Sequence, residues 1–304
     1  MMVNERMGFS AEDRLLIVNG DDFGMCHAAN AGIGQLLEEG VISSATVMVP
    51  CAWSAEAAAI ASGNPAYDIG IHLTLTSEWE PYKWGPVRQD GPVDTLVTKQ
   101  GWFPPDCKTV ELQADSEQVK QELFAQVQRG IAMGIDPTHL DNHMGSVYGL
   151  ATGRDFLEET LEVCEHFQLP LRLPKNPGDR EKHMPPALLE RYRERLQSAE
   201  KRGVMLIDHL DGLSFHLEPG EDYDQARETM IGKLRSMKAG ITEMIIHPFH
   251  DTDELRAVMP HWEKRRIEFE LFRDPVIRRV LEEEGIRMIG WRDLRNVQRS
   301  GGHT

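Results

Sequence analysis

The sequence has 304 residues, with 33 basic and 49 acidic side chains, so its formal net charge is −16. This acidic balance leaves no extended basic surface to neutralise phosphates, which excludes a nucleic-acid partner and disfavours binding to anionic membranes. Hydrophobic residues make up 40% of the chain, enough for a sizeable core, so wholesale disorder is excluded as well.

The cysteines and the apolar runs bear on the cellular compartment. Cys26, Cys51, Cys107 and Cys164 include no CxxC pair, which disfavours a disulfide scaffold or a zinc finger. The lead-in 1–13 is polar and charged and lacks the apolar core of a secretion signal. No apolar run reaches the roughly 18 residues of a membrane span. We therefore expect a cytoplasmic protein without a membrane partner.

Short apolar runs alternate with amphipathic helix patterns along the chain. The predicted strands are 15–19, 44–49, 68–73, 138–141, 170–173, 204–208, 243–247 and 286–289. The predicted helices lie near 26–39, 53–62, 115–133, 154–167, 185–202, 221–238 and 260–284. Asp115 or Ser116 suits the N-cap of the third helix, and Gly40 suits the end of the first.

The alternation of strands and helices predicts a parallel sheet. Several strands, such as 15–18, are almost wholly apolar, as expected for strands that are covered on both faces. Seven or eight such units favour a closed or nearly closed TIM-like barrel over an open sheet. No linker rich in Gly, Pro or Ser divides the chain, so we predict one α/β domain over 1–304.

One stretch, 76–115, interrupts this rhythm with a long connection rich in aromatic residues. Its aromatic side chains are Trp79, Tyr82, Trp84, Trp102 and Phe103. A connection of this length is usually functional, and here it directly follows a predicted strand. Two interpretations stay open: a rim that stacks on a sugar or another flat ligand, and a surface excursion that packs its own aromatic rings.

Acids and histidines follow five of the predicted strands. They are Asp21 and Asp22 after the first strand, His72 at the end of the third, the segment 139–143 (His-Leu-Asp-Asn-His) at the fourth, His209 after the sixth and His247 at the seventh. In α/β barrels the carboxyl ends of the strands form the face that holds the active site. We therefore expect these side chains to meet in one site.

The adjacent carboxylates of Asp21 and Asp22 would repel each other after a buried strand, and a divalent cation would relieve that repulsion. Side chains of neighbouring residues in an extended segment point to opposite sides, so one acid can bind a metal while the other faces a substrate. A helix N-cap is the alternative interpretation, although a cap needs only one acid.

Histidines supply the remaining candidate ligands. His72 ends an apolar strand, and His139 and His143 are four residues apart where Pro137 indicates a strand rather than a helix. One of these two histidines is therefore the expected ligand. A carboxylate and two imidazoles would leave open positions for water or substrate, which is the stoichiometry of a catalytic metal site.

His247 precedes Pro248, which favours an extended backbone at the strand end. A histidine at the mouth of a barrel suits general acid–base catalysis, because its pKa lies near neutrality. A buried histidine bonded to backbone is the alternative. No GxSxG, GxGxxG or P-loop motif follows a strand, so a serine hydrolase and a nucleotide-binding enzyme lack support.

Six ordered motifs make the sequence resemble the YdjC/ChbG-like carbohydrate deacetylases, which are related to polysaccharide deacetylases. The motifs are LIVNGDDFG at 16–24, GVISS at 40–44, IGIHLT at 69–74, THLDNH at 138–143, IHP at 246–248 and WRDL at 291–294. The resemblance implies a distorted (β/α)7–8 barrel. It also implies a homodimer and removal of acetyl groups from N-acetylated sugars such as chito-oligosaccharides.

The resemblance further implies roles for single residues. It places one divalent metal ion on Asp22, His72 and His143, with Asp21 as the catalytic base and His247 as the acid. Two nitrogens and one oxygen suit zinc, and magnesium, manganese, cobalt and nickel remain open. Where the family often continues past His143 in an HxHxH pattern, this chain reads MGSVY, so the residues lining the sugar site differ.

Four further residues are predicted to bind the substrate. Arg172 is placed like a substrate-contact arginine of the family, and Asp141, Trp79 and Trp84 are assigned to the sugar site. The prediction is a metal-dependent hydrolase that acts on a small carbohydrate and gives acetate and a free amine. The alternatives are a metal-dependent barrel enzyme of other chemistry, such as a sugar isomerase or phosphoesterase, and a non-catalytic sugar-binding protein on the same fold.

Overall fold

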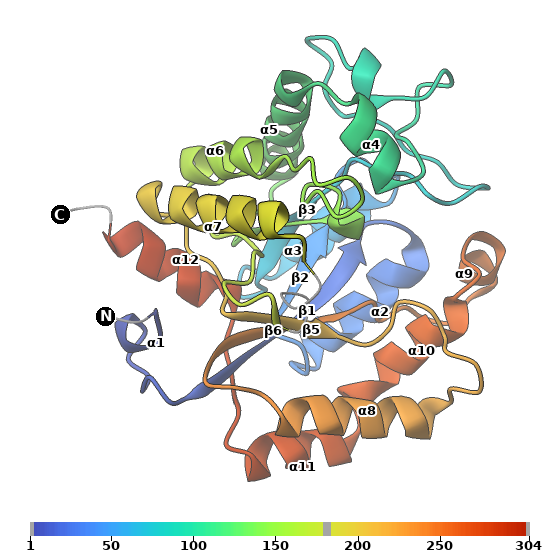
Figure 1. The fold of residues 1–304 in the computed structure, drawn as a ribbon. Helices are drawn as coiled ribbons and strands as arrows, with labels where there is room; N and C mark the ends of the chain where they lie inside the picture. The colour runs from blue at the N-terminus through green and yellow to red at the C-terminus, as the bar shows by residue number, and fades with distance from the viewer. Residues whose placement is uncertain (1–2, 179–183, 302–304) are drawn as a thin grey trace.

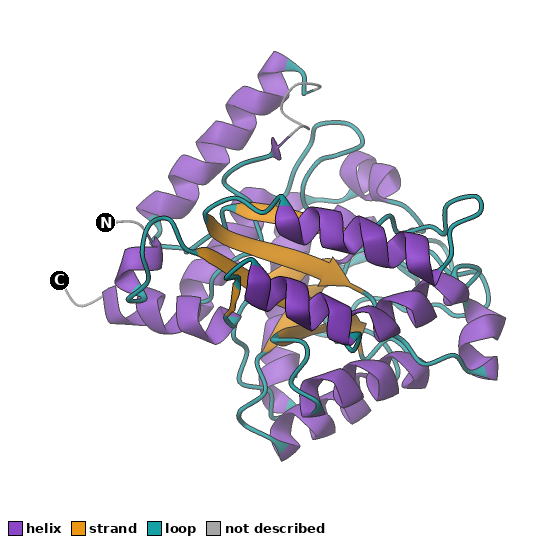
Figure 2. Cartoon of the chain, turned by 90° about the horizontal axis from the view of Figure 1, so that it is seen from below, coloured by secondary structure: helices purple, strands orange, loops and turns teal. Residues whose placement is uncertain are grey.

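The computed structural model describes residues 3–178 and 184–301, and one parallel sheet forms the centre of this part of the chain. Residues 1–2 of the polar lead-in lie outside the described residues. The strands are β1 (Arg14–Phe23), β2 (Ser44–Val47), β3 (Ile69–Leu73), β4 (Leu140–Asn142), β5 (His209–Gly212), β6 (Gly240–Ile246) and β7 (Arg287–Met288). Figure 2 shows these strands in the middle of the molecule, with helices around them.

The strands follow the order β4-β3-β2-β1-β6-β5, and β7 pairs with the first residues of β1. The sheet curls until its two edges approach each other. Leu171 links the edges, because it forms one-residue parallel bridges with Leu140 of β4 and with Leu206, just before β5. The predicted α/β barrel is therefore confirmed, in a distorted form that is closed by a single residue on one side.

The helices cover the outside of the sheet (Figure 1). They are α1 (Val3–Arg6), α2 (His27–Glu38), α3 (Ser54–Gly63), α4 (Cys107–Gln113), α5 (Ser116–Ala132), α6 (Leu157–Phe167), α7 (Pro186–Lys201), α8 (Tyr223–Arg235), α9 (Asp253–Val258), α10 (Trp262–Leu271), α11 (Pro275–Glu283) and α12 (Trp291–Ser300), with the 3-10 turns η1 (Asp94–Leu96) and η2 (His143–Gly145). None of the helices in the described ranges has both the length and the apolar composition that a membrane crossing requires.

Local sequence signals set several helix ends. The side chain of Asp115 accepts a hydrogen bond from the backbone N–H of Gln118 and so caps α5. Gly40 follows α2 with a φ of +64°, a conformation that glycine adopts without the steric cost of a Cβ. The predicted helix 260–284 is wrong as one element, because Pro275 cannot continue a helix and instead begins α11.

Two predicted strands are much shorter in the structure. The stretches 170–173 and 204–208 contribute only the bridges at Leu171 and Leu206, and β5 begins at His209, after the predicted end of its strand. Apart from Arg172 and Asp208, both stretches are apolar and buried, so their composition resembles that of strands. In this part of the barrel, one-residue bridges join the neighbouring segments in place of continuous ladders of hydrogen bonds. Composition does not show which residues pair across a sheet, so it could not predict this difference.

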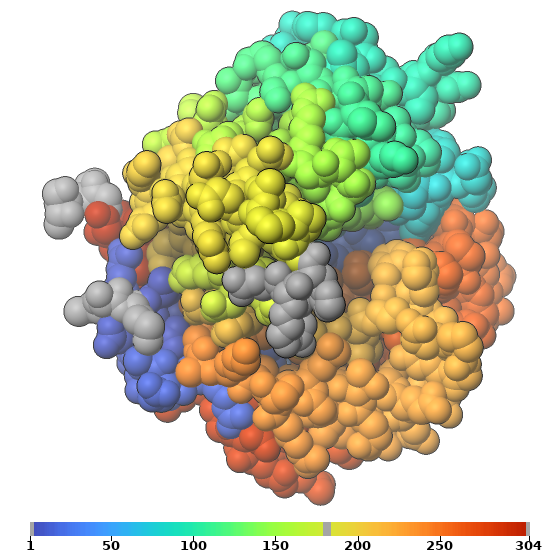
Figure 3. Space-filling model, viewed as in Figure 1, coloured from blue at the N-terminus to red at the C-terminus, as the bar shows by residue number. Residues whose placement is uncertain are grey.

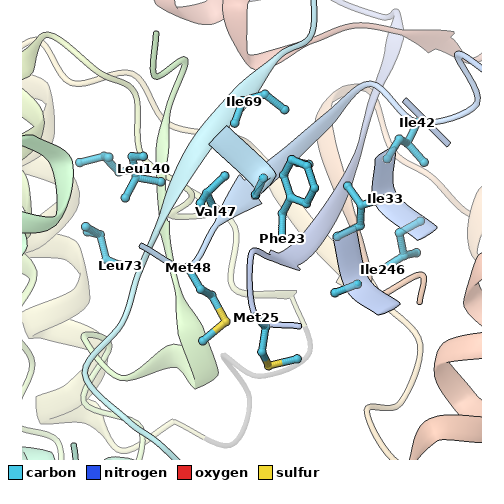
Figure 4. Close-up of a cluster of buried hydrophobic side chains, with 14 of the residues drawn as sticks. Phe23, Met25, Ile33, Ile42, Val47, Met48, Ile69, Leu73, Leu140 and Ile246 are labelled. Atoms are coloured by element: carbon cyan, nitrogen blue, oxygen red, sulfur yellow. The ribbon is translucent and has the colours of Figure 1, made fainter. Parts of the chain in front are cut away.

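Two apolar clusters fix the barrel. The outer cluster lies between sheet and helices, and Figure 4 shows Phe23 of β1 beside Val47 of β2 and Ile33 of α2. The second cluster contains alternate residues of β1, Leu15 and Ile17, together with Ile207, Ile241, Ile289, Trp291 and Leu294. Because side chains alternate along a strand, Asn19 and Asp21 continue the row that Leu15 and Ile17 begin, toward the carboxyl end of β1.

Candidate metal and catalytic site

The strand ends bring five of the predicted residues together at one end of the barrel. Nε2 of His72 lies 3.3 Å from Oδ1 of Asp22, and Nδ1 of His143 lies 3.2 Å from the same oxygen. Nε2 of His247 is 4.0 Å from Oδ2 of Asp22, and Oδ2 of Asp21 is 3.9 Å from Nε2 of His72. The predicted meeting of strand ends is therefore present for these five residues, with Asp22 at its centre, whereas His209 begins β5 and so lies at the amino end of its strand.

The end of β1 has an irregular backbone that aims both acids at the site. The pairing of β1 with β2 shifts register between Gly20 and Phe23, and Asp22 has a φ of +66°. A non-glycine residue in this conformation is strained, and such strain gathers at functional positions. The expectation that the two carboxylates point to opposite sides is wrong, because this bulge turns Asp22 so that both acids face His72.

The side chains of Asp22, His72 and His143 fit a metal ion. Each offers one ligand atom, these atoms lie within 4.8 Å of one another, and all three residues are buried. Two ligand atoms that each lie about 2.1 Å from one ion are roughly 3.0–3.4 Å apart in octahedral or tetrahedral geometry, and the separations of 3.2 and 3.3 Å around Asp22 match this. Asp21, His72 and Asp141 form an overlapping group, but Arg172 already pairs with both of its acids.

Charge complementarity holds this cluster together. Burial alone would raise the pKa of Asp22, but His143 and His72 outweigh it and hold that pKa well below its usual value. Burial alone would lower the pKa of His72, but Asp141 and Asp21 raise it to about 9. In the same way, Glu78 and Asp22 raise the pKa of His143 well above its usual value. The site is thus built to attract positive charge.

Arg172, which follows Leu171 at the closure of the barrel, is buried among three acids. Its Nη1 and Nη2 each donate a 2.7 Å hydrogen bond to Asp21, and Nη2 also lies 2.7 Å from Glu243 and 2.8 Å from Asp141. Burial would raise the pKa of Asp21, but Arg172 and His72 lower it to about 2. Burial raises the pKa of Glu243 to about 7, although Arg172 opposes this. Arg172 therefore keeps Asp21 ionised.

Asp141 has both of its oxygens occupied by protein side chains. Oδ1 lies 2.7 Å from Nδ1 of His72, and Oδ2 accepts a 2.8 Å hydrogen bond from Thr46 and pairs with Arg172. The Asp141 side chain has no exposed surface. A carboxylate at Nδ1 leaves Nε2 of His72 to face Asp22, which is the arrangement that orients histidine ligands in metal sites.

His247, at the end of β6, stands at the edge of the cluster and keeps some contact with solvent. Its backbone N–H donates a 3.0 Å hydrogen bond to Glu268, whose carboxylate also lies 3.7 Å from Nδ1 of the ring. Arg265 pairs with Glu268 at 2.7 Å and stacks over Phe215, whose ring meets His247 edge-on at 5.3 Å. The ring of His247 thus lies between Glu268 and Phe215, with Nε2 toward Asp22.

The aromatic segment after β3 lies partly against the site. Trp84 packs its ring against His143 at 6.1 Å, and its indole N–H donates a 2.7 Å hydrogen bond to the carbonyl oxygen of Thr76. Trp79 and Tyr82 pack against Trp84 in turn. Trp79 and Trp84 are buried, and only Trp102 among the five aromatic residues is exposed. The role of Trp79 and Trp84 in binding a sugar stays a prediction.

Of the two histidines around β4, the one after its end reaches the metal cluster. His143 opens the turn η2, where Met144 has a φ of +56°. His139 instead stacks on Trp291 at 4.5 Å and an interplanar angle of 7°. Burial and Arg172 lower the pKa of His139 well below its usual value. His139 therefore belongs to the packing of the barrel interior, near the second apolar cluster.

Sequence reasoning missed three acids that contact site residues. They are Glu78 on His143, Glu243 on Arg172 and Glu268 on His247. A glutamate in the apolar run of β6 was a usable signal for Glu243, because a charged residue in a buried strand needs a partner. Glu78 and Glu268 carry no such signal, since each looks like an ordinary surface acid in its segment.

The face shown in Figure 3 has a hollow. It lies between the green-yellow segments on one side and the orange segments on the other, and blue residues from the N-terminal part of the chain are visible at its floor. The parts of the cluster that reach solvent are His247 and Glu78, whose side chains are 16% and 20% exposed.

Comparison with known proteins identifies the family. The family of YdjC-like proteins matches residues 15–283. A carbohydrate deacetylase of Thermus thermophilus is 31% identical over 293 residues, which covers 96% of this chain and 98% of the relative. A chitooligosaccharide deacetylase of Yersinia enterocolitica is 27% identical over 288 residues, which covers 92% of this chain and 99% of the relative.

A solved structure shares the fold. It comes from Enterococcus faecalis V583 and is named for cellobiose-phosphate cleavage. It superposes with a TM-score of 0.73 at 25% sequence identity, over 93% of this chain and 99% of that chain. The resemblance seen in the motifs is confirmed by these matches: the chain belongs to the family of YdjC-like proteins.

Proposed function

We propose that this protein is a metal-dependent carbohydrate deacetylase, which hydrolyses the N-acetyl group of an amino sugar to acetate and a free amine. The observation that carries the proposal is the convergence of Asp22, His72 and His143 on one point, with Asp21 directly beside them. The names of the two relatives support the reaction and the substrate class.

The three ligand side chains would hold one divalent ion at the carboxyl end of the barrel. Such an ion polarises a carbonyl group and acidifies a water molecule. Asp21 would take the proton from the attacking water. Its Oδ2 accepts a hydrogen bond from Arg172 and can accept a second one, because a carboxylate oxygen has two lone pairs. This oxygen lies 3.9 Å from Nε2 of His72. The ion pair with Arg172 keeps this acceptor ionised at neutral pH.

His247 would act as the general acid. Hydrolysis adds water to the amide carbon and breaks the C–N bond, so the leaving nitrogen must gain a proton. Nε2 of His247 faces the cluster from the side opposite to the supporting acid Glu268, at 4.0 Å from Asp22. We assign Asp141 a supporting role at His72 and Arg172 a supporting role at Asp21, because protein groups occupy both oxygens of Asp141 and both terminal nitrogens of Arg172.

The alternative functions fit the charged side chains of the site less well. A phosphoesterase or a sugar-phosphate isomerase must bind a phosphate anion, which calls for a basic clamp. The two buried arginines nearest the site, Arg172 and Arg265, are both paired with acids. A non-catalytic sugar-binding protein needs no second ionised acid beside the metal ligand Asp22, whereas hydrolysis needs one. The site therefore favours hydrolysis of a substrate without a phosphate group.

Three finer points belong to the same proposal. Two imidazoles and one carboxylate suit zinc best, with magnesium as the alternative. All four cysteines are free thiols, three of them buried, which fits a reducing compartment such as the cytoplasm. The homodimer follows from the family resemblance, and light scattering on the purified protein would measure it.

The proposal is tested by metal analysis and acetate release on the purified protein. We expect about one equivalent of a divalent ion, and acetate from at least one member of a panel of N-acetylated mono- and oligosaccharides. A chelator should abolish acetate release, and adding back the ion should restore it. Stoichiometric metal without acetate from any member of the panel would favour the other chemistries, and sugar binding without turnover would favour the binding protein.

A further inference from the structure

Glu78 is an acid outside every motif that the sequence singles out, and it contacts the candidate ligand His143. Both oxygens of its carboxylate face Nε2 of His143, at 3.1 and 3.0 Å. The other ring nitrogen, Nδ1, lies 3.2 Å from Oδ1 of Asp22. The imidazole of His143 therefore stands between two carboxylates, with the metal cluster on one side and Glu78 on the other.

His72, the second candidate histidine ligand, also stands between two carboxylates, but its two ring nitrogens have the opposite roles. Nδ1 of His72 faces the carboxylate of Asp141 at 2.7 Å, and Nε2 faces Asp22 at 3.3 Å. A histidine can bind a metal only through a nitrogen with a free lone pair, so its proton must sit on the other nitrogen. A carboxylate at that other nitrogen selects this tautomer and fixes the plane of the ring.

Hydrogen bonds of the neighbouring residue Ser77 anchor the backbone beside Glu78. Ser77 donates a backbone hydrogen bond to Pro104, and its side chain accepts one of 3.1 Å from the backbone of Trp84. The indole of Trp84 also packs against the ring of His143. The Glu78 side chain itself is 20% exposed, so it lies at the rim of the site and not in the core.

We propose that Glu78 is a positioning residue, which holds the proton of His143 on Nε2 and so presents Nδ1 to the metal ion. This inference rests on the proposed function, because it assumes that His143 is a ligand. It adds that the two histidine ligands coordinate through different ring nitrogens, Nε2 for His72 and Nδ1 for His143, each set by its own acid.

The test compares Zn²⁺ affinity, measured by competition with a chromophoric chelator, in the wild type and four variants. Glu78→Ala removes both the charge and the acceptor, Glu78→Gln keeps an acceptor in place without the charge, and Glu78→Asp keeps the charge but falls short of the ring. Glu80→Gln is the matched control, because Glu80 is an exposed acid two residues away.

Positioning predicts that Glu78→Ala and Glu78→Asp weaken Zn²⁺ binding about 10–100-fold, which is the usual effect of losing an outer partner of a ligand. Glu78→Gln should lose less, and Glu80→Gln should bind as the wild type does. If the charge of Glu78 alone mattered, Glu78→Gln would match Glu78→Ala and Glu78→Asp would match the wild type. That pattern, or unchanged binding by Glu78→Ala, overturns the proposal.

NMR of the zinc-loaded protein with ¹⁵N-labelled histidine gives an independent signature. The wild type should show His143 protonated on Nε2 in slow exchange with water, and Glu78→Ala should lose this protected proton. A His143 that is protonated on Nδ1 in the zinc-loaded wild type overturns the proposal while leaving the metal site intact. A wild type that binds no divalent ion removes the proposed function itself, so the two failures are distinguishable.

Discussion

Arg172 and Asp21 form a two-point ion pair inside the barrel, in which each terminal nitrogen of the guanidinium lies 2.7 Å from a different oxygen of the carboxylate. The same guanidinium faces Glu243 and Asp141. One cation therefore holds three buried acids next to the metal cluster. Loss of Arg172 would leave buried acids without their cation, and an unpaired buried charge is costly. The stability of the fold therefore depends on Arg172 more than on any surface ion pair.

We expect Arg172→Met to destabilise the protein by about 3–5 kcal/mol, the usual cost of removing one partner of a buried pair. Urea denaturation followed by circular dichroism measures this loss. Adding Asp21→Asn to the Arg172→Met variant removes one of the stranded charges, so the double variant should regain part of the stability. A single variant within about 1 kcal/mol of the wild type would show that the pair behaves like one at the surface.

The Asp21→Asn and Asp22→Asn variants should lose activity for different reasons. Asp22→Asn removes a ligand, so metal content and activity should fall together. Asp21→Asn should keep its metal and lose about 10²–10⁴-fold in kcat, the usual effect of losing a positioned base, while KM changes much less. Metal content and kcat on both purified variants decide the matter. An Asp21→Asn enzyme that keeps most of its kcat would exclude Asp21 as the base.

A substitution at Trp84 distinguishes a role in packing from a role in sugar binding. Its side chain is only 3% exposed, it packs against His143, and its indole N–H is hydrogen-bonded to Thr76. We expect Trp84→Leu to cost roughly 2–4 kcal/mol in unfolding free energy, through lost contacts and an unpaired carbonyl. The KM for the sugar should rise less than tenfold. A large rise in KM with unchanged stability would instead establish the predicted sugar contact.

Asp68, just before β3, should make stability depend on pH. Burial raises its pKa to about 6 from an ordinary 3.8, although Thr138 and the backbone N–H of Arg292 bond to its carboxylate. Between these two pH values the folded protein holds a proton that the unfolded chain has released. The contribution of Asp68 to stability must therefore fall as the pH rises from about 4 to about 6, and stay constant above that.

The measurement compares the wild type with Asp68→Asn, which cannot titrate, by urea denaturation between pH 4 and pH 7.5. The stability of the wild type relative to this variant should be highest near pH 4 and decline by roughly 2–3 kcal/mol as the pH rises, since each unit of pKa shift is worth about 1.4 kcal/mol. A difference that is flat with pH, or that grows above pH 5, contradicts the assignment. Glu80→Gln serves as the control for an exposed acid.

The sequence by itself determined the barrel and the approximate membership of the site. The apolar strand 15–18 and the regular alternation with helices specify a parallel sheet, because a strand buried on both faces has little polar surface. In such a sheet all carboxyl ends lie at one edge, so the residues that follow the strands meet whatever their separation in the chain. This is why Asp21, Asp22, His72 and His247 were predictable.

The tertiary structure decided everything that depends on register, ring orientation and distant partners. The bulge in β1 turns Asp21 and Asp22 to the same side, and the turn η2 brings His143, not His139, to the metal cluster. The partners Glu78 and Glu268 come from segments without a periodic pattern. Sequence periodicity reports which face of an element is buried, whereas the contact between two side chains also depends on backbone conformation and on the packing of elements far apart in the chain.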